Sequence, residues 1–345
     1  MKILVLGGSR FLGRTFVEEA LRRNHEVTIF NRGIQNPGIK DVEVLTGNRF
    51  GNLKALQNRH WDAVLDTSGF IPYTVQNTTN LLKDRVKHYT FISSISVYQD
   101  WVPENLDESY SVLEMSLEEA NKLSMDSDEP VYDYYGHFKA LCEQIAESNM
   151  PGRVLNVRAG QLIGPNDYTD RVPYWINRIA KGGKVMVPGS PHRRVQVIDN
   201  KDLSNWILDM EEQDSTGTFN ATGPDYSLTM KEFIDACIKV TDSNAEVVWT
   251  DEKFLLDQKV APWTEMPLWV PENYPLSPET KEPWKGAFSI NVDKAIQSGL
   301  SFRKLEESIA DIYEWEKTRH LTEYEWKSGM RAEKEKELLT ILNEK

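Results

Sequence analysis

The fold of this chain is decided by residues 1–16, which read MKILVLGGSRFLGRTF. The apolar run at 2–6 is typical of a buried strand, and an amphipathic helix begins near residue 12. Glycines between the two permit a tight turn, let the backbone approach a pyrophosphate and let the helix pack closely. The first turn of the helix then faces the phosphates. We therefore predict that a dinucleotide binds at Gly7, Gly8, Ser9, Arg10, Phe11, Leu12 and Gly13.

The first 160 residues alternate short apolar runs with amphipathic stretches, which is typical of a parallel sheet with helices on both faces. We expect strands at residues 2–6, 26–30, 42–45, 63–66, 88–93 and 154–157, and helices at residues 12–24, 74–82 and 134–147. The predicted fold class is therefore α/β: a Rossmann-type doubly wound parallel sheet with a smaller C-terminal α+β part.

The pattern loosens after residue 165. We expect helices at 173–181, 202–211, 229–240 and 305–317, strands at 195–198 and 246–250, and a long ordered loop at 260–286. We predict a dinucleotide-binding domain at 1–165, with 195–225 returning to it, a substrate-binding part at 166–194 and 226–320, and a helical tail at 321–345. The charged amphipathic tail could dock on the body or on a partner, and a homodimer is one arrangement that we consider.

Composition limits the partners of the chain. The 345 residues carry a net charge of -13, which argues against nucleic acid and acidic membranes as partners. No apolar run approaches the roughly 18–20 residues that span a bilayer, and the N-terminus does not read as a signal peptide. Cys142 and Cys237 are expected to be free thiols in a cytoplasmic protein. Eleven acidic residues and one base, Lys122, lie between Asp100 and Asp133, which favours a solvated surface insertion.

The ends of the second and fourth strands bear on the choice of dinucleotide. Asn31 and Arg32 stand where an NAD-selective site commonly has an acidic residue for the ribose 2′-hydroxyl, and an arginine there accommodates a 2′-phosphate. The cofactor is therefore NAD or NADP, with Arg32 favouring NADP unless it is only a turn residue facing solvent. Ser68 and Gly69, which follow the fourth strand, are small enough for a dinucleotide to lie across the sheet edge.

Tyr135 and Lys139 lie four residues apart on one face of a predicted helix. A nearby ammonium favours the phenolate and lowers the pKa of a tyrosine, so Tyr135 is a candidate general base. Such pairs also arise by chance. Ser94, at the carboxyl end of the fifth predicted strand, lies where ligands bind open α/β sheets and can hydrogen-bond a reacting oxygen. We therefore predict Ser94, Tyr135 and Lys139 as the catalytic residues, and we expect Tyr135 and Lys139 to contact the cofactor as well.

These pieces together resemble an extended short-chain dehydrogenase/reductase of the NAD-dependent epimerase/dehydratase family. The matching stretches are GGSRFLG, FISSISVY, YGHFK, RAGQLIGP and VIDNKDL, which occur in order over roughly residues 1–320. The resemblance implies that Ser94 is the catalytic serine, Tyr135 the base and Lys139 its partner, which also holds the nicotinamide ribose. It also implies that the C-terminal part binds a nucleotide sugar.

The chain departs from the family pattern in three places. Arg10 replaces the usual middle glycine, as in the divergent branch that includes chloroplast stem-loop-binding proteins. Ile95 and Ser96 occupy the positions where sugar-nucleotide dehydratases have Asp-Glu, so dehydration lacks its acid and base. The acidic insertion separates Ser94 from Tyr135, where it either caps the active site or decorates the surface.

The candidate substrate ligands are mostly arginines, because a guanidinium matches the geometry of a phosphate. Arg171, Arg193 and Arg194 are candidates for a substrate diphosphate, although surface arginines also serve to balance an acidic protein. Ser96 is a further candidate. Residues 263–269 form either a wall over the substrate or ordinary loop packing. The histidines show no metal-ligand spacing, so no metal site is predicted.

We predict an NAD(P)-dependent sugar-nucleotide epimerase or reductase in which Tyr135 acts as general base at a hydroxyl-bearing carbon. Arg32 mildly favours a reductase, since a reductase must release its cofactor. The alternative is a non-catalytic dinucleotide-binding or RNA-associated protein of the divergent branch. A third reading is an NADP-linked redox sensor that acts through partner contacts of its C-terminal helix.

Overall fold

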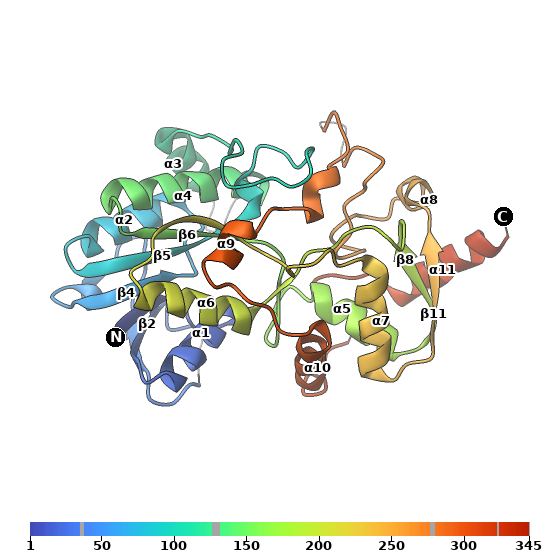
Figure 1. Ribbon diagram of the computed structural model, residues 1–345, viewed down its shortest axis with the longest axis horizontal. Helices are drawn as coiled ribbons and strands as arrows, with labels where there is room; N and C mark the ends of the chain where they lie inside the picture. The colour runs from blue at the N-terminus through green and yellow to red at the C-terminus, as the bar shows by residue number, and fades with distance from the viewer. Residues whose placement is uncertain (35–37, 126–131, 277–279, 323, 345) are drawn as a thin grey trace.

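A seven-stranded parallel sheet forms the larger part of the molecule (Figure 1). The computed structural model describes residues 1–34, 38–125, 132–276, 280–322 and 324–344. The strands, in spatial order, are β10 (Gly217–Ala221), β6 (Val154–Ala159), β5 (Val86–Ser94), β4 (Trp61–Asp66), β1 (Lys2–Leu6), β2 (Glu26–Asn31) and β3 (Glu43–Thr46). The chain leaves β3 at one edge and returns to pair β4 with β1, so the strand order reverses beside β1. Ligands of open α/β sheets bind at such a reversal.

Helices cover both faces of this sheet, as Figure 1 shows. One face carries α1 (Phe11–Arg22) and α6 (Asn200–Glu212), which contact each other. The other carries α2 (Pro72–Leu82), α3 (Leu117–Met125) and α4 (Tyr135–Asn149). Single 3₁₀ turns are η1 (Lys54–Leu56), η2 (Ile95–Val97), η3 (Tyr132–Tyr134) and η4 (Lys285–Phe288).

The smaller part, at the right of Figure 1, is built on a two-stranded parallel sheet. Its strands are β8 (Gly183–Pro188) and β11 (Ala245–Thr250). The helices that follow residue 165, apart from α6, are α5 (Arg171–Ala180), α7 (Met230–Thr241), α8 (Glu252–Asp257), α9 (Asp293–Gln297), α10 (Leu305–Glu316) and α11 (Ala332–Asn343). A second short pairing joins β7 (Leu162–Ile163) to β9 (Ile198–Asp199). The smaller part has its own core, in which Trp175 and Trp269 are fully buried.

The predicted fold class is confirmed, and the six predicted strands of the first 160 residues all lie in the central sheet. The strand expected at 195–198 is wrong, because the observed strand is only Ile198–Asp199. Strands β7, β8 and β10 were not predicted. The β10 sequence, GTFNA, reads as a loop because polar Asn220 interrupts it, yet Asn220 is fully buried. Its side chain accepts from the Tyr98 hydroxyl at 2.6 Å and donates to the Asn291 carbonyl at 3.0 Å.

The C-terminal helix docks on the body of the protein. Leu338 is buried against the core of the smaller part, and Lys334 pairs with Glu265 at 2.6 Å. Glu335 is 4% exposed and accepts hydrogen bonds from Arg178 Nε at 2.5 Å and the Met186 amide at 3.0 Å. The helix spans Ala332–Asn343, so the described residues just before it belong to a loop.

The described part of the acidic insertion exposes most of its acidic side chains, as expected, but other residues anchor it to the fold. Leu106 is buried, and α3 packs against α2. The Asn105 amide donates to the Ser289 carbonyl at 2.7 Å, and the Gly286 amide donates to the Trp101 carbonyl at 2.8 Å. These bonds tie the insertion to the segment near η4. Residues 126–131, which fall within the predicted acidic run, lie outside the described residues.

The structure also bears on the two cysteines and on membrane-spanning helices. Cys142 and Cys237 are both free and buried. Among the described residues, no helix is long and apolar enough to cross a membrane. The division of the chain into a dinucleotide-binding part and a substrate-binding part stays a prediction.

A buried glutamate on α6 makes the stability of the protein depend on pH. Glu211 is 1% exposed, and its Oε1 accepts from Thr90 Oγ1 at 2.8 Å while its Oε2 has no partner among the described residues. Burial raises the pKa of Glu211 from 4.5 to about 8. Between these values the folded state keeps a proton that the unfolded chain has released. Its contribution to stability is therefore complete below about pH 4.5 and is lost as the pH rises towards 8.

We expect Glu211→Gln to remove this loss. In the wild type the free energy of unfolding should fall by about 1.4 kcal/mol per pH unit over that range through this group. Denaturant unfolding at a series of pH values measures the slope, which should be flatter in the variant whatever its absolute stability. Glu337→Gln, on the exposed face of α11, should keep the wild-type slope. Equal slopes in wild type and Glu211→Gln would show that Glu211 is ionised in the folded state.

Candidate functional site

The glycine-rich turn between β1 and α1 has the backbone that a bound pyrophosphate requires. Gly7 and Gly8 have φ of 112° and 77°, a region that favours glycine. A Cβ on Gly13 would lie 2.9 Å from the Gly8 amide nitrogen, so α1 passes the turn too closely for any side chain there. A Cβ on Gly7 would lie 2.4 Å from Thr67 Oγ1. The first and third glycines of the motif are thus fixed by sterics.

The first turn of α1 is left open to an anion. Its N-cap residue, Arg10, makes no side-chain cap, and the first turn contains no acidic residue. Backbone N–H groups at a helix start bind phosphate when no side chain satisfies them. The Arg10 side chain is exposed at the turn. These observations fit a dinucleotide whose pyrophosphate is held by residues 7–13.

Asn31, at the end of β2, holds the glycine turn in place. Its Nδ2 donates to Ser9 Oγ at 2.9 Å, and its Oδ1 accepts from the Gly33 amide at 2.8 Å. The side chain is therefore already used within the protein. Arg32, next to it, is exposed. Asn31 and Arg32 are the two candidates for recognising the adenosine ribose, and Arg32 is the exposed one.

A buried ion pair supports the end of β4. Arg49 Nη1 and Nη2 donate to Asp66 Oδ1 and Oδ2 at 2.7 and 2.6 Å, and Asp66 is fully buried. Tyr89 Oη also donates to Asp66 Oδ2 at 2.7 Å. Burial alone would raise the pKa of Asp66, but the charge of Arg49 and these hydrogen bonds leave it lowered. The Ser68 amide donates to Asp66 Oδ1 at 3.0 Å, so the pair fixes the loop that carries Ser68 and Gly69.

Arg49 was not singled out in the sequence. It follows β3 in the stretch TGNR, and nothing in that spacing connects it with Asp66. The sequence did contain one indication of the pair: Asp66 is a carboxylate at the end of an otherwise apolar strand. A buried charge of this kind requires a partner. The sequence alone does not say which of the arginines that partner is.

Ser94 and Tyr135 are brought together by two different elements. Ser94 ends β5 and is 9% exposed, and Tyr135 is the first residue of α4. A hydrogen bond between the two side chains lowers the pKa of Tyr135, but burial has the larger effect and raises it to about 12. Ser94 Oγ also accepts from the Ser96 amide at 3.1 Å and lies 3.1 Å from Ser96 Oγ. The predicted serine–tyrosine pair is therefore present at the carboxyl edge of the sheet.

Lys139 does not act on Tyr135 in the way that the sequence suggested. Its ammonium donates to the carbonyls of Gly69 at 2.9 Å and Ile92 at 2.5 Å, and it lies 4.3 Å from the centre of the Phe91 ring. Burial lowers the pKa of Lys139 to about 8. The expected lowering of the Tyr135 pKa by Lys139 is therefore wrong for this structure: the lysine is held by backbone carbonyls, and burial dominates at the tyrosine.

Arg171 is the cation whose charge reaches the Tyr135 hydroxyl. It begins α5, and its positive charge lowers the pKa of Tyr135, while nearby Tyr168 raises it. The Arg171 guanidinium lies 4.9 Å from the centre of the Trp263 ring, and its buried Nε has no partner among the described residues. Asp167 interacts with it through charge, and burial raises the pKa of that carboxyl to about 6. The charge of Arg171 therefore reaches Tyr135, while its substrate-binding role stays a prediction.

Tyr168 connects this cluster with the glycine turn. Its ring meets the Phe11 ring edge-to-face, with centroids 6.1 Å apart, and its side chain is 53% exposed. Phe11 belongs to the predicted cofactor-binding turn. The loop before α5 therefore approaches both the dinucleotide site and Tyr135.

A small cavity lies beyond Ser94, next to η2. It has a volume of about 20 Å³ and is lined by Ile95, Trp101, Gln161, Gln196, Thr222, Trp263, Ala287 and Phe288. Thr222 Oγ1 is buried there without a partner among the described residues. A cavity of this size holds a water molecule but not a sugar ring. Trp263 and Trp101 therefore wall the space beside Ser94, so both the 260–286 loop and the insertion reach the site.

The other two candidate arginines are placed differently. Arg193 is 3% exposed, and its Nε and Nη2 donate to the carbonyls of Pro188 at 3.2 Å and Leu268 at 2.5 Å. Burial lowers its pKa to about 10. Only its Nη1 has no partner among the described residues. Arg194 is exposed and donates to Ser289 Oγ at 3.3 Å.

Comparison with known proteins identifies the family. A sequence model of the NAD-dependent epimerase/dehydratase family matches residues 3–222, which is more than half of the chain. The chain belongs to this family. The match includes the glycine turn, Ser94, Tyr135 and Lys139, and it ends just after β10.

Proteins similar to this epimerase/dehydratase-family chain are named for different roles. The chloroplast stem-loop binding protein of 41 kDa b from Arabidopsis thaliana is 26% identical over 262 residues, which are 69% of this chain and 62% of that protein. The chain thus matches less than two thirds of that relative's length. UDP-glucuronic acid 4-epimerase from Bacillus cereus, solved with NAD, has a TM-score of 0.63 and 15% identity, covering 92% of this chain and 99% of its own. UDP-N-acetylglucosamine 4-epimerase from Bacillus cereus has a TM-score of 0.62 and 20% identity, with 91% and 98% covered.

Proposed function

We propose that this protein is an NAD(P)-dependent epimerase that acts on a hydroxyl-bearing carbon of a nucleotide sugar. The observation that carries the proposal is the hydrogen-bonded pair of Ser94 and Tyr135 at the carboxyl edge of the sheet. This pair lies on the same edge as the glycine turn after β1, because parallel strands all end there. Membership of the family and the similarity to NAD-containing epimerase structures support it.

The proposed chemistry begins with a proton. Tyr135 accepts the proton of a substrate hydroxyl, while Ser94 hydrogen-bonds the same oxygen and stabilises its developing charge. Arg171 stabilises the phenolate form of Tyr135, since its charge lowers the pKa of that group. A bound oxidised nicotinamide supplies the hydride acceptor and a further positive charge. Residues 7–13 hold its pyrophosphate, and Lys139 fixes the Gly69 loop beside it.

Epimerisation is favoured over dehydration by the residues after Ser94. Elimination of water from the sugar requires an acid and a base near the reacting carbons. Ile95 and Ser96 stand in those positions, and the Ser96 hydroxyl is hydrogen-bonded to Ser94. A side chain of isoleucine transfers no proton.

The proposal is tested by incubating the purified full chain with UDP-glucuronic acid and with UDP-N-acetylglucosamine. Proton NMR of the sugar detects a 4-epimer, and the near-ultraviolet absorbance of the protein detects reduced nicotinamide. We expect an epimer to form with no net consumption of cofactor. A net, stoichiometric loss of NADPH would instead show a reductase. If neither NAD nor NADP binds, the protein is not a hydride-transfer enzyme of any kind.

Arg32 gives a separate prediction about the choice of dinucleotide. Its guanidinium is exposed at the end of β2, where the 2′-position of the adenosine ribose lies in related folds. We expect Arg32→Ala to weaken NADP binding by about tenfold, the effect of one charge-assisted contact with phosphate, and to leave NAD binding unchanged. Calorimetric titration with each cofactor measures both constants. An equal effect on NAD and NADP would mean that Arg32 does not contact a 2′-phosphate.

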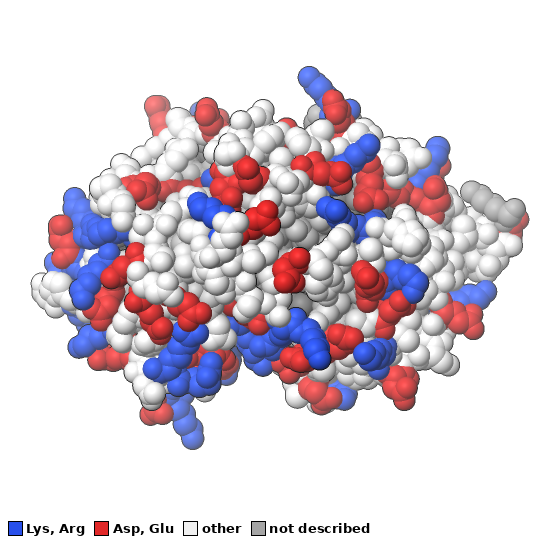
Figure 2. Space-filling view, in the orientation of Figure 1, with Lys and Arg blue, Asp and Glu red and all other residues white. Residues whose placement is uncertain are grey.

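Binding to RNA is a second candidate, because one relative is named a stem-loop binding protein. The net charge of -13 opposes it, since RNA affinity depends on phosphate contacts with Lys and Arg. On the face drawn in Figure 2, acidic and basic residues are interspersed. We expect no salt-sensitive shift of a stem-loop RNA in a gel at micromolar protein. A shift that weakens steeply with salt would support this second function.

A further inference from the structure

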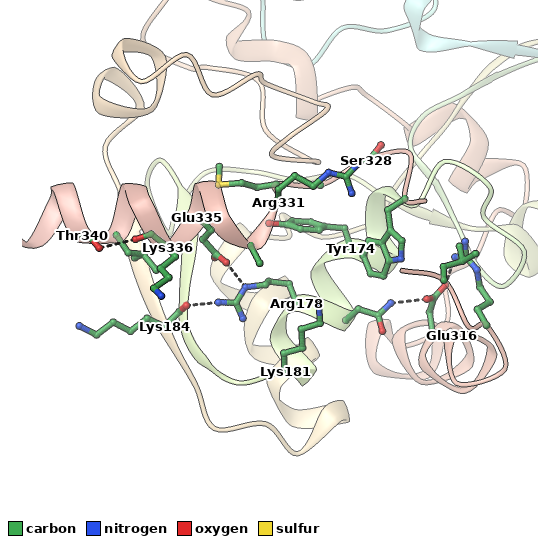
Figure 3. A pocket seen from close by; sticks show the side chains of 18 of the residues that line it. Tyr174, Arg178, Lys181, Lys184, Glu316, Ser328, Arg331, Glu335, Lys336 and Thr340 are labelled. Atoms are coloured by element: carbon green, nitrogen blue, oxygen red, sulfur yellow. Dashed lines mark hydrogen bonds and ion pairs between the residues drawn. The ribbon is translucent and has the colours of Figure 1, made fainter. Parts of the chain in front are cut away.

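A pocket with no part in the proposed reaction lies between α5, the loop before α11 and α11 itself (Figure 3). Its volume is about 520 Å³, within the range of roughly 300–1,000 Å³ that is usual for small-molecule sites. The pocket and the candidate active site share helix α5. Arg171 begins that helix beside Tyr135, whereas Arg178 lines the pocket seven residues later, about 10 Å along the axis.

One wall of the pocket is apolar and aromatic. Tyr174 and Trp326 meet edge-to-face with ring centroids 6.3 Å apart, and Leu339 of α11 also lines the space. Leu321, at the margin, is 40% exposed. Such a wall matches a ligand with a flat or aliphatic body, since the contact removes apolar surface from water.

The framework of the pocket is held by a part-buried ion pair. Arg178 Nε donates to Glu335 Oε2 at 2.5 Å, and Arg178 Nη1 donates to the Gly182 carbonyl at 3.0 Å. Glu335 in turn accepts from the Met186 amide, which fixes α11 against β8. On the other side, Arg319 pairs with Glu316. The acidic residues of the lining, Glu316 and Glu335, are therefore both neutralised by arginines.

Three lysines of the lining have no such partner. Lys181, Lys184 and Lys336 line the pocket and are exposed. Figure 3 shows Lys181 and Lys336 near the Arg178–Glu335 pair, with the Lys184 side chain extending outward from it. Within the described ranges, none of the three ammonium groups makes a hydrogen bond or ion pair. The pocket therefore carries an excess of positive charge in a protein whose net charge is -13. Unpaired ammonium groups attract a multiply charged anion, and Lys binds phosphate as a point charge.

We propose that this pocket binds a small phosphorylated molecule with an aromatic body. The body packs against Trp326 and Leu339, and the phosphate is held by Lys181, Lys184 and Lys336. The site is distinct from the dinucleotide turn and from Tyr135. It does not depend on the proposed epimerase activity, because its test uses binding alone.

The probe is naphthyl phosphate, which has a flat apolar body and one phosphate. Calorimetric titration of the full chain is carried out with NAD and NADP at saturation, so that the dinucleotide site is filled. We expect naphthyl phosphate to bind at least about tenfold more tightly than either inorganic phosphate or naphthol, since each of these lacks one half of the recognition. Naphthol binding as tightly as naphthyl phosphate would overturn the phosphate site, as would the absence of any heat from the probe.

Substitutions locate the binding. The double variant Lys181→Gln, Lys336→Gln should weaken the binding of naphthyl phosphate by about tenfold or more. Lys184→Glu should weaken it by as much, and this substitution lies outside helices α5 and α11. Lys83→Gln removes the same charge from an exposed site at the end of α2 and should have no effect. Melting temperatures check that each variant is folded. Unchanged affinity in the double variant and in Lys184→Glu would refute the proposal.

Discussion

Replacing Tyr135 by phenylalanine is expected to lower turnover by about 10²–10⁴-fold, the usual contribution of a general acid–base residue. In the proposed mechanism the phenol accepts the proton of the substrate hydroxyl, and phenylalanine keeps the ring while removing that oxygen. The ring lies against Phe70, with centroids 6.3 Å apart, so packing at the start of α4 should survive. The rate is measured by using NMR to monitor the interconversion of UDP-glucuronic acid and its 4-epimer.

The affinity for the dinucleotide separates a chemical effect from a structural one. Tyr135→Phe should bind NAD or NADP within about threefold of wild type, since residues 7–13, which we propose hold the pyrophosphate, are the same in both. Tyr134→Phe is the matched control. Its ring stacks against Phe138 at 6.4 Å, and we expect turnover close to that of wild type. A fully active Tyr135→Phe enzyme would exclude Tyr135 from the mechanism.

Asp66→Asn is expected to lower the free energy of unfolding by about 3–5 kcal/mol. The substitution removes one charge of a buried pair and leaves the Arg49 guanidinium, 10% exposed, without a counter-ion. Urea unfolding at neutral pH measures the loss. The pH dependence has a definite sign, because the Arg49 charge holds the folded-state pKa of Asp66 below 3.8 against the opposing effect of burial. The stabilisation is present above that value and is lost as the pH falls through the lower, folded-state pKa.

A second aspartate on β4 provides the control. Asp62 pairs with Lys87 at 2.7 Å, but the two side chains are 35% and 75% exposed. Exposed pairs contribute about 0–1 kcal/mol, so Asp62→Asn should cost no more than about 1 kcal/mol. The same change of residue at two positions of one strand thus isolates the effect of burial. A cost at Asp66 as small as that at Asp62 would mean that Arg49 finds other solvation in the folded state.

The local sequence was sufficient for most elements of the larger part. Apolar periodicity predicts strand β1 and helix α1. The spacing of the three glycines predicts the dinucleotide-binding turn. The Thr229 cap of α7 is an equally local signal, and its capping box with Glu232 is present. Strand β10 was missed because its stability comes from distant partners of Asn220 rather than from apolar residues of its own.

The amino-acid sequence by itself determined that this chain has a glycine-turn Rossmann sheet with Ser94, Tyr135 and Lys139 along its carboxyl edge. These features depend on spacing within one strand or helix, where the backbone fixes the geometry. The tertiary structure decided what surrounds each group. It placed Lys139 on backbone carbonyls, Arg49 on Asp66 and the charge of Arg171 within reach of Tyr135. It also placed three lysines, without ion-pair partners in the described part of the chain, around one pocket. The physical reason is that pKa values and ion pairs depend on burial and on neighbours far away in sequence, which no local pattern encodes.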